Sequence, residues 1–160
     1  MPDPNRYYKK RTFTLGLPQE KRNKIFFRPQ YPPHPNEVEE YQKILEPLVK
    51  AGVYRPTNSP HNNPVMLVEK KAPGKFRLVV DNRLVNAECR PVGAMSATPL
   101  GIIKLMAGAR IFTTLDCKNA FYSLLLAEED RPLTAITPPG GGRLELTRMP
   151  MGAKASTAAL

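Results

Sequence analysis

The sequence has few of the residues that form disulfides, zinc sites or membrane spans. Its 160 residues include two cysteines, two histidines and no tryptophan. Two cysteines make no disulfide framework, and neither lies in a zinc or thiol-redox motif. No apolar run approaches the roughly 20 residues that a membrane helix needs, and the N-terminus lacks the apolar core of a signal peptide. These absences favour a cytoplasmic or nuclear protein without a membrane partner.

Acidic residues are also scarce. The chain has 14 Asp and Glu against 24 Lys and Arg, a formal net charge of +10. Such a protein attracts polyanions, and phosphate contacts dominate non-specific binding to nucleic acids. Much of the excess lies in residues 1–30, which we expect to be a basic, disordered lead-in. A second basic group lies on a predicted hairpin, where ordered cations can hold a particular phosphate: Lys70, Lys71, Lys75 and Arg77.

Eighteen prolines divide the remaining chain into short elements. The apolar spacing predicts a helix from Asn36 to Gly52, which Pro47 should kink or shorten, and a second helix over 98–107. A third, helix-like segment is expected near the end of the chain. Alternating or β-branched runs predict strands over 65–70, 76–81, 111–116, 123–126, 133–137 and 143–148.

The run over 111–116 is the most informative, because it ends in a single carboxylate, Asp116. Ligands collect at the carboxyl ends of strands in α/β sheets, and hard metal cations prefer carboxylate oxygens. Asp is also a common cap for a helical turn, here one that would begin at Cys117. The residues alone leave both roles open, and the two can coexist.

Six segments give the chain a recognisable order. They are Ala51–Pro56, Asn58–Lys71, Phe76–Asn86, Thr114–Tyr122, Glu128–Ala135 and Arg148–Lys154. Each segment alone is a weak signal, but their order and spacing together resemble the N-terminal half of a reverse transcriptase. The resemblance is strongest to the enzymes of gypsy-like long-terminal-repeat retrotransposons, with retroviral enzymes further away.

The resemblance implies an α+β architecture, a partial right-hand polymerase fold. Residues 64–90 would form the fingers hairpin, and the strand over 111–116 would begin the antiparallel sheet of the palm, backed by helices. Residues 31–160 would then be an incomplete reverse transcriptase domain. Residues 1–30 fall outside the match and would be the lead-in from an upstream part of a polyprotein.

The resemblance also implies a reaction, the addition of deoxynucleotides to a primer by two-metal phosphoryl transfer with Mg²⁺. Asp116 matches the first catalytic, metal-binding aspartate, and the backbone carbonyl of Cys117 matches its neighbouring oxygen ligand. Lys70 and Arg77 match the fingers cations that close over the nucleotide triphosphate. A solvated hairpin tip is the alternative for these two cations.

Four further positions match the nucleotide pocket. Asn119 and Ala120 match residues whose backbone amides hold the triphosphate. Phe121 matches the aromatic residue that excludes a 2′-hydroxyl by its bulk, and its neighbour Tyr122 is assigned to the core. Met151 stands where retroviral relatives carry Gln, so any hydrogen bond from that side chain is lost.

Three positions match the template side of the site. Asp81 and Arg83 match residues lining the template, although a structural ion pair is equally plausible for them. Gly152 would let the template backbone approach closely.

The second half of the implied metal site, a Tyr-x-Asp-Asp hairpin, does not occur in the sequence. We therefore expect a retrotransposon polyprotein fragment that does not polymerise alone, while the parent enzyme acts on an RNA or DNA primer–template and deoxynucleotide triphosphates. Two alternatives stay open. One is a non-catalytic, basic nucleic-acid-binding module derived from a retroelement, and the other is a truncated pseudogene product.

Overall fold

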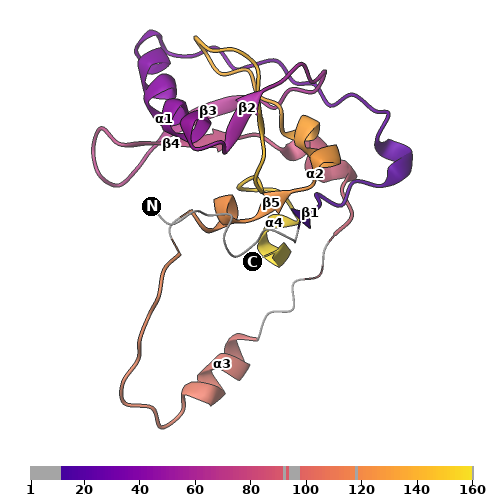
Figure 1. The fold of residues 1–160 in the computed structure, drawn as a ribbon. Helices are drawn as coiled ribbons and strands as arrows, with labels where there is room; N and C mark the ends of the chain where they lie inside the picture. The colour runs from indigo at the N-terminus through magenta and orange to yellow at the C-terminus, as the bar shows by residue number, and fades with distance from the viewer. Residues whose placement is uncertain (1–11, 92, 94–97, 118, 160) are drawn as a thin grey trace.

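The computed structural model describes residues 12–91, 93, 98–117 and 119–159 and shows a mixed α+β fold (Figure 1). No helix in these residues is long and apolar enough to cross a membrane. The strands are β1 (Thr12–Phe13), β2 (Tyr54–Pro56), β3 (Val65–Glu69), β4 (Phe76–Val80), β5 (Leu125–Leu126) and β6 (Leu144–Leu146). The α-helices are α1 (Val38–Lys50), α2 (Arg83–Glu88), α3 (Pro99–Met106) and α4 (Ser156–Ala159). Four 3-10 turns complete the order: η1 (Gln19–Lys21), η2 (Pro35–Glu37), η3 (Ala120–Ser123) and η4 (Glu128–Thr134).

The first predicted helix forms close to its expected position. The turn η2 leads into α1, and the backbone N–H of His34 donates to Glu37 Oε2 at 3.0 Å. Pro47 lies in the last turn of α1, so it neither ends nor shortens the helix. Gly52 follows with a φ of +68°, a left-handed conformation that ends the helix at little steric cost. The predicted end of this helix is therefore confirmed.

The predicted hairpin is confirmed and carries the longest strands of the described residues. Antiparallel β3 and β4 pair in register from Val65 opposite Val80 to Glu69 opposite Phe76. At the tip, the backbone N–H of Lys70 donates to the Lys75 carbonyl at 2.7 Å. Gly74 supplies the positive φ, +71°, that the turn requires.

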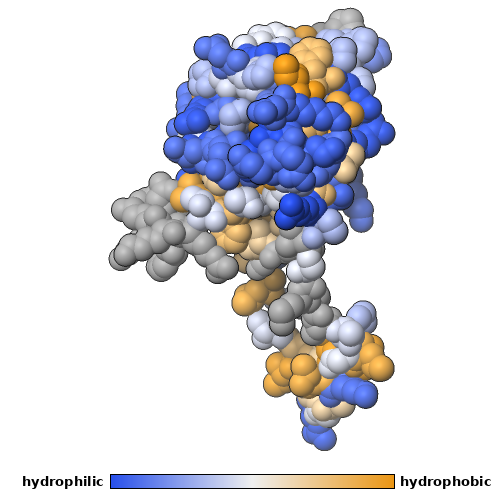
Figure 2. All heavy atoms as spheres, turned by 90° about the vertical axis from the view of Figure 1, so that its right-hand side faces the viewer, coloured by the Kyte–Doolittle hydropathy of each residue, from blue (hydrophilic) through white to orange (hydrophobic). Residues whose placement is uncertain are grey.

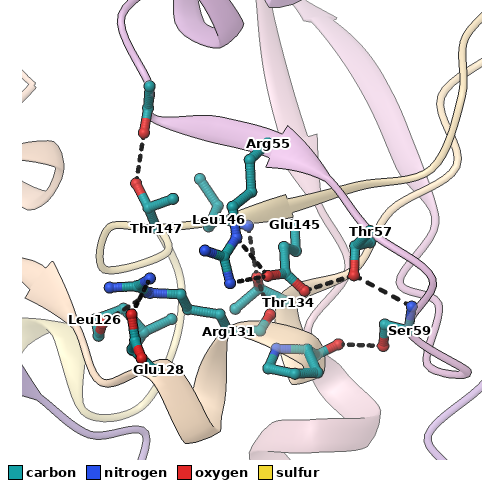
Figure 3. Close-up of polar contacts among 12 residues, drawn as sticks. Arg55, Thr57, Ser59, Leu126, Glu128, Arg131, Thr134, Glu145, Leu146 and Thr147 are labelled. Atoms are coloured by element: carbon teal, nitrogen blue, oxygen red, sulfur yellow. Dashed lines mark hydrogen bonds and ion pairs between the residues drawn. The ribbon is translucent and has the colours of Figure 1, made fainter.

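Two smaller sheets join segments that are distant in sequence. Strand β2 pairs antiparallel with β6, and β1 pairs in parallel with β5. Within the β2–β6 pair Arg55 lies opposite Glu145, and the buried Glu145 carboxylate accepts from Arg55 Nε at 2.8 Å and from Thr57 Oγ1 at 2.6 Å (Figure 3). This network fixes the start of the connector that leads from β2 into the hairpin.

The predicted strand over 133–137 is wrong for its first residues, which belong to the 3-10 turn η4. Side chains close the turn on itself: Arg131 Nε donates to the Leu126 carbonyl at 3.1 Å, and Thr134 Oγ1 donates to the Arg131 carbonyl at 2.7 Å (Figure 3). Because these side-chain bonds already occupy backbone carbonyls in and just before the turn, they favour the 3-10 conformation over a strand ladder. Only Ile136 keeps a strand-like bridge, to Leu144.

Two apolar clusters form the core. The first packs the hairpin against α1 and the β2–β6 pair, and it is built from Tyr41, Leu45, Val53, Tyr54, Val65, Ile136 and Leu146. The second lies around β5, α2 and the final segment, and it is built from Leu15, Leu17, Phe26, Val85, Cys89, Leu124, Leu126, Leu133, Met149, Ala153 and Ala155. The clusters lie on opposite sides of η3, which supplies Tyr122 to the first and Phe121 to the second.

The described part of the expected lead-in, residues 12–30, is folded and not disordered. Leu15 and Leu17 are buried in the second cluster. The backbone N–H of Leu15 donates to Asp130 Oδ2 at 2.6 Å, and Arg22 Nη2 donates to Asp130 Oδ1 at 2.8 Å. The many positive charges of this segment predicted disorder. Burial of its two leucines and the bonds to the Asp130 carboxylate instead keep it packed against the fold. Residues 1–11 lie outside the described residues, and the domain boundary at residue 30 stays a prediction.

Residues 98–117 form an arm that stands apart from the body (Figure 1). Helix α3 begins as predicted, with the backbone N–H of Gly101 donating to Thr98 Oγ1 at 3.2 Å. The predicted strand over 111–116 is wrong: this segment has no regular structure and is exposed throughout. A strand needs a neighbour for its backbone groups, and no described segment pairs with it. Apolar side chains consequently face solvent along the arm (Figure 2).

Candidate functional site

Four of the predicted nucleotide-binding residues line one groove of about 570 Å³. Lys70 and Arg77 reach it from the hairpin, Asn119 from the start of η3, and Met151 from the loop after β6. The remaining wall comes mainly from apolar side chains of α1 and β4: Ile44, Pro47, Leu48, Phe76 and Leu78. The groove therefore combines two cations with an apolar surface, and it joins segments more than 70 residues apart.

The register of the hairpin explains why the two cations share a face. Arg77 lies opposite Val68, and Lys70 follows Val68 by two residues, so all three side chains project from the same side. Among the described residues, neither Lys70 nor Arg77 has an ion-pair partner. Two uncompensated positive charges at the mouth of an apolar groove attract anions such as phosphates.

The turn at the start of η3 sets the position of Asn119. Its φ of +55° is the only positive value among the described non-glycine residues, and Asn tolerates this left-handed conformation better than most side chains. The Asn119 carbonyl then accepts from the backbone N–H of Tyr122 at 2.9 Å, which closes the 3-10 turn. This part of the groove wall thus depends on the left-handed conformation of Asn119, which the hydrogen bond of the 3-10 turn stabilises.

The structure places two neighbouring aromatics on different sides of η3. Tyr122, which sequence reasoning assigns to the core, packs against the first apolar cluster and also lines the groove, while Phe121 packs against the second cluster. Neither Phe121 nor Ala120 is among the residues that line the groove. In a 3-10 turn successive side chains point about 120° apart, so adjacent aromatics cannot share a face. No sequence signal distinguishes which of the two turns toward the groove.

Two asparagine side chains hold the loop that carries Met151. One lies in α2 and the other is the residue that precedes α2. Asn82 Nδ2 donates to the Met151 carbonyl at 3.3 Å, and Asn86 Nδ2 donates to the Gly152 carbonyl at 2.9 Å. Gly152 has a φ of +85°, which a residue with a Cβ adopts only with strain. Sequence reasoning missed the two asparagines, although their spacing of four residues on a short helix places them on one face.

Asp81 and Arg83 form an ion pair in the structure. Arg83 Nε donates to Asp81 Oδ1 at 2.8 Å, and Arg83 Nη2 donates to Oδ2 at 2.7 Å. Arg28 and Tyr31 also donate to Oδ2, at 2.8 and 2.7 Å. These donors, Arg83 foremost, hold the pKa of the Asp81 carboxyl far below its usual range. These bonds connect the segment before α1 to the end of β4. Asp81 and Arg83 therefore form the structural ion pair that was the alternative to a template-lining role.

Asp116 and Cys117 lie on the exposed arm, outside the groove. Mg²⁺ takes six oxygen ligands in near-octahedral geometry. Within the described ranges, no three side chains of His, Cys, Asp or Glu gather closely enough to hold a metal ion. The described residues therefore do not form a complete magnesium site. Asp116 and the Cys117 carbonyl supply part of one at most.

Comparison with known proteins identifies the family. Residues 68–160, more than half of the chain, match the family described as reverse transcriptase (RNA-dependent DNA polymerase). The chain belongs to this reverse transcriptase family. It is 37% identical over 114 residues to the retrovirus-related Pol polyprotein from transposon gypsy of Drosophila melanogaster. That alignment covers 68% of this chain and 11% of the polyprotein.

Solved structures support the same assignment. A crystal structure of the prototype foamy virus protease-reverse transcriptase matches 95% of this chain and 20% of its own, with a TM-score of 0.82 and 31% identity. The foamy viral protease-reverse transcriptase in complex with double-stranded DNA matches 83% of this chain and 28% of its own, with a TM-score of 0.70 and 28% identity. The predicted family and the α+β polymerase fold are thus confirmed. The chain spans between a tenth and about a quarter of the proteins compared.

Proposed function

We propose that this reverse transcriptase chain provides the nucleotide-binding face of a retrotransposon RNA-directed DNA polymerase. The observation that carries the proposal is the convergence of Lys70, Arg77, Asn119 and Met151 on one groove. Residues separated by up to 81 positions in the sequence meet there, and two of them are cations without ion-pair partners among the described residues. This chemistry suits a deoxynucleotide triphosphate, which combines several negative charges with an apolar base.

The two cations would bind the phosphates in different ways. The planar guanidinium of Arg77 can donate two parallel hydrogen bonds to phosphate oxygens, while the flexible Lys70 ammonium follows the remaining charge. The apolar wall from α1 and β4 would cover the sugar or base, as Leu48 and Leu78 expose carbon surface to the groove. Asn119 and Ala120 are proposed to place backbone amides near the phosphates. Phe121 is proposed to exclude a 2′-hydroxyl once the site is assembled.

For the metal-dependent step we propose that Asp116 and the Cys117 carbonyl contribute ligands within a longer enzyme. Bound Mg²⁺ would there neutralise charge on the reacting phosphates. Because no three His, Cys, Asp or Glu side chains of the described residues gather into a metal-binding group, this chain alone is proposed to have no polymerase activity. The chain is accordingly interpreted as a fragment of a polyprotein.

On the template side, we propose that Gly152 allows close approach of a nucleic-acid backbone. Its backbone is exposed, and a Cβ built at this position would meet no atom within 4 Å, so the space beside it is open. Asp81 would act indirectly, since its carboxylate is already occupied by Arg83 and Tyr31. The foamy virus relative bound to double-stranded DNA supports a primer–template as the partner.

Binding of dTTP to the purified chain tests the groove. Lys70→Ala and Arg77→Ala should each weaken binding by about five- to tenfold, because each removes one charge-assisted contact at a partly solvated site. Lys50→Ala is the matched control, since Lys50 is an exposed lysine of α1 that pairs with Glu46 outside the groove. Equal weakening by all three variants would indicate charge alone and contradict the groove.

A primer-extension assay tests the proposed inactivity. The chain with Mg²⁺, a primer–template and deoxynucleotides should extend no primer above a protein-free control. Measurable, Mg²⁺-dependent extension would show that the described carboxylates suffice and would overturn this part of the proposal.

The net charge of +10 favours a second candidate function, that of a non-catalytic nucleic-acid-binding module. This function predicts binding to both RNA and DNA with little sequence preference and a strong dependence on salt. Binding that is absent at 50 mM salt would eliminate it, whereas dTTP binding to the groove would be unaffected by that result.

A further inference from the structure

The arm formed by residues 98–117 carries most of the large apolar residues that the described part of the chain leaves exposed. Eight of them are between 44% and 91% exposed: Leu100, Ile102, Ile103, Leu105, Met106, Ile111, Phe112 and Leu115. At roughly 150–200 Å² for a fully exposed side chain of this size, they present on the order of 1,000 Å² to solvent (Figure 2). A stable interface covers about 800 Å² on each partner, so the arm alone is large enough to form one.

The body of the same chain offers no matching surface for the arm. Outside the arm, the large apolar residues that are described as exposed are Ile25, Phe27, Val68 and Met151. They belong to three separate segments, namely the stretch before α1, strand β3 and the loop after β6. A partner that covers the arm must bring an apolar surface of similar extent. The arm of a second copy of this chain brings one.

The backbone of the arm after α3 is also available for pairing. Residues 110–116 are exposed and without regular structure, and no other described residue forms a backbone hydrogen bond with them. Their apolar and β-branched composition favours a strand. An unpaired segment of this kind is a template for a strand from another chain, because main-chain hydrogen bonds then satisfy both backbones.

The sequence over 110–116 is complementary to itself in one antiparallel register. When two copies pair with Thr113 opposite Thr113, Arg110 lies opposite Asp116 and Ile111 lies opposite Leu115. Two-fold symmetry makes each of these pairs occur twice. Opposite charges, and apolar side chains, stabilise a sheet when they lie directly opposite each other. Within the described residues neither Arg110 nor Asp116 has an ion-pair partner in its own chain, so both charges are available.

The neighbouring registers lose this match. A shift by one residue in one direction places Ile111 opposite Asp116, and a shift in the other direction places Leu115 opposite Arg110. Each shifted register therefore sets a charge against an aliphatic side chain. The register centred on Thr113 also places Ile111 and Leu115 of both copies on one face of the strand pair, because side chains alternate with a period of two.

We propose that two copies of this chain dimerise through their arms. Residues 110–116 of the two copies form an antiparallel strand pair centred on Thr113, with an Arg110–Asp116 ion pair at each end. The exposed apolar side chains of α3 pack onto the apolar face of this pair. The proposal goes beyond the proposed nucleotide site and does not depend on it, because the groove lies on the body and the interface lies on the arm.

Sedimentation equilibrium of the 160-residue chain under reducing conditions tests the dimer. The unmodified chain should show a monomer–dimer equilibrium. Arg110→Asp and Asp116→Arg should each raise the dimer Kd about tenfold or more, because each sets like charges opposite each other at both ends of the strand pair. The double variant restores opposite charges and should return the Kd to within about threefold of the original. Lys71→Asp, on the exposed hairpin tip, is the matched control for net charge and should leave the Kd unchanged.

Cross-linking tests the register. In a chain that carries Cys117→Ser, Thr113→Cys should form a disulfide-linked dimer on mild oxidation, because directly opposite residues have Cα atoms about 4.5–5.5 Å apart, within disulfide range. Thr114→Cys is the matched control. The two copies of residue 114 would be diagonal neighbours about 7–8 Å apart, too far for a disulfide to form readily.

Three results would overturn the proposal. The first is a chain that stays monomeric up to about 100 μM, or that forms only open-ended aggregates without a discrete dimer. The second is a dimer that both charge reversals leave unchanged, or that the double variant fails to restore. The third is cross-linking at residue 114 in preference to residue 113. Sedimentation of the unmodified chain needs no variant, and a failed dTTP titration would leave all three outcomes unchanged.

Discussion

The buried carboxylate of Asp130 offers the sharpest test of how the N-terminal segment is held. It is completely buried, and it accepts from the Leu15 backbone N–H at 2.6 Å and from Arg22 at 2.8 Å. Both partners belong to a segment more than 100 residues away. If this network docks the segment, then substitutions at either end of the ion pair must destabilise the whole fold.

The expected magnitudes differ for the two ends. Asp130→Asn keeps an oxygen for the Leu15 N–H and loses the ion pair, so we expect a loss of about 1.5–3 kcal/mol, the range for hydrogen bonds to charged groups. Arg22→Ala leaves a buried carboxylate without its cation, and such losses run at about 3–5 kcal/mol. Arg22 is itself partly solvated, with 21% of its side chain exposed, so the lower end of that range applies.

Urea unfolding followed by circular dichroism measures these losses, with the double variant completing a thermodynamic cycle. Arg22→Ala should cost more than Asp130→Asn, and the double variant should cost less than the two single losses together. Glu129→Gln is the control, because Glu129 is largely exposed and contacts the same arginine only at 3.3 Å; it should change stability by less than about 0.5 kcal/mol. Losses below that value at both Arg22 and Asp130 would refute the docking.

Three further predictions follow from single contacts. Tyr54→Phe removes a buried hydroxyl that lies beside the Tyr122 hydroxyl but makes no hydrogen bond of ordinary geometry, so the substitution should stabilise the fold by about 1 kcal/mol in urea unfolding; a loss of that size would show that the two hydroxyls are hydrogen-bonded. His61 is buried, accepts the Phe26 backbone N–H at 3.0 Å, and has a pKa lowered chiefly by burial. Folding therefore favours its neutral form. Stability should be full above the ordinary pKa of about 6.5 and fall as pH drops below it, with a slope of at most about 1.4 kcal/mol per pH unit. His61→Gln should flatten that part of the profile, and an unchanged profile would contradict the assignment. Asn86→Ala should speed hydrogen exchange in the loop at Gly152 without changing exchange in β3, since it removes the 2.9 Å bond to that carbonyl; equal protection in both proteins would show that the bond does not hold the loop.

The elements that form from neighbouring residues were predictable. The alternation in β3 and β4 and the glycine turn between them specify a hairpin whose register places Lys70 beside Arg77. The cap at Thr98 likewise specifies the start of α3. In these cases the hydrogen bonds join residues fewer than about 16 positions apart, so the local pattern contains both partners.

The candidate site was predictable only in part. Four of its lining residues were identified from the sequence, but Tyr122 was assigned to the core and Phe121 to the nucleotide pocket. In the structure Tyr122 packs against the first apolar cluster and also lines the groove, while Phe121 packs against the second cluster. Which aromatic faces which cluster depends on residues distant in sequence, so no pattern within η3 predicts it.

By itself, the sequence determined the family, the basic character and the local elements, including the carboxylate motif that ends in Asp116. Only the tertiary structure decided which of these elements are paired. Residues 12–30 pack against the rest of the fold, although their positive charge predicted disorder. Residues 111–116 stay unpaired, although their apolar and β-branched composition favours a strand. The physical reason is the same in both cases. A strand or a buried segment is stable only when distant residues satisfy its backbone and cover its side chains, and a local pattern contains no information about that distant partner.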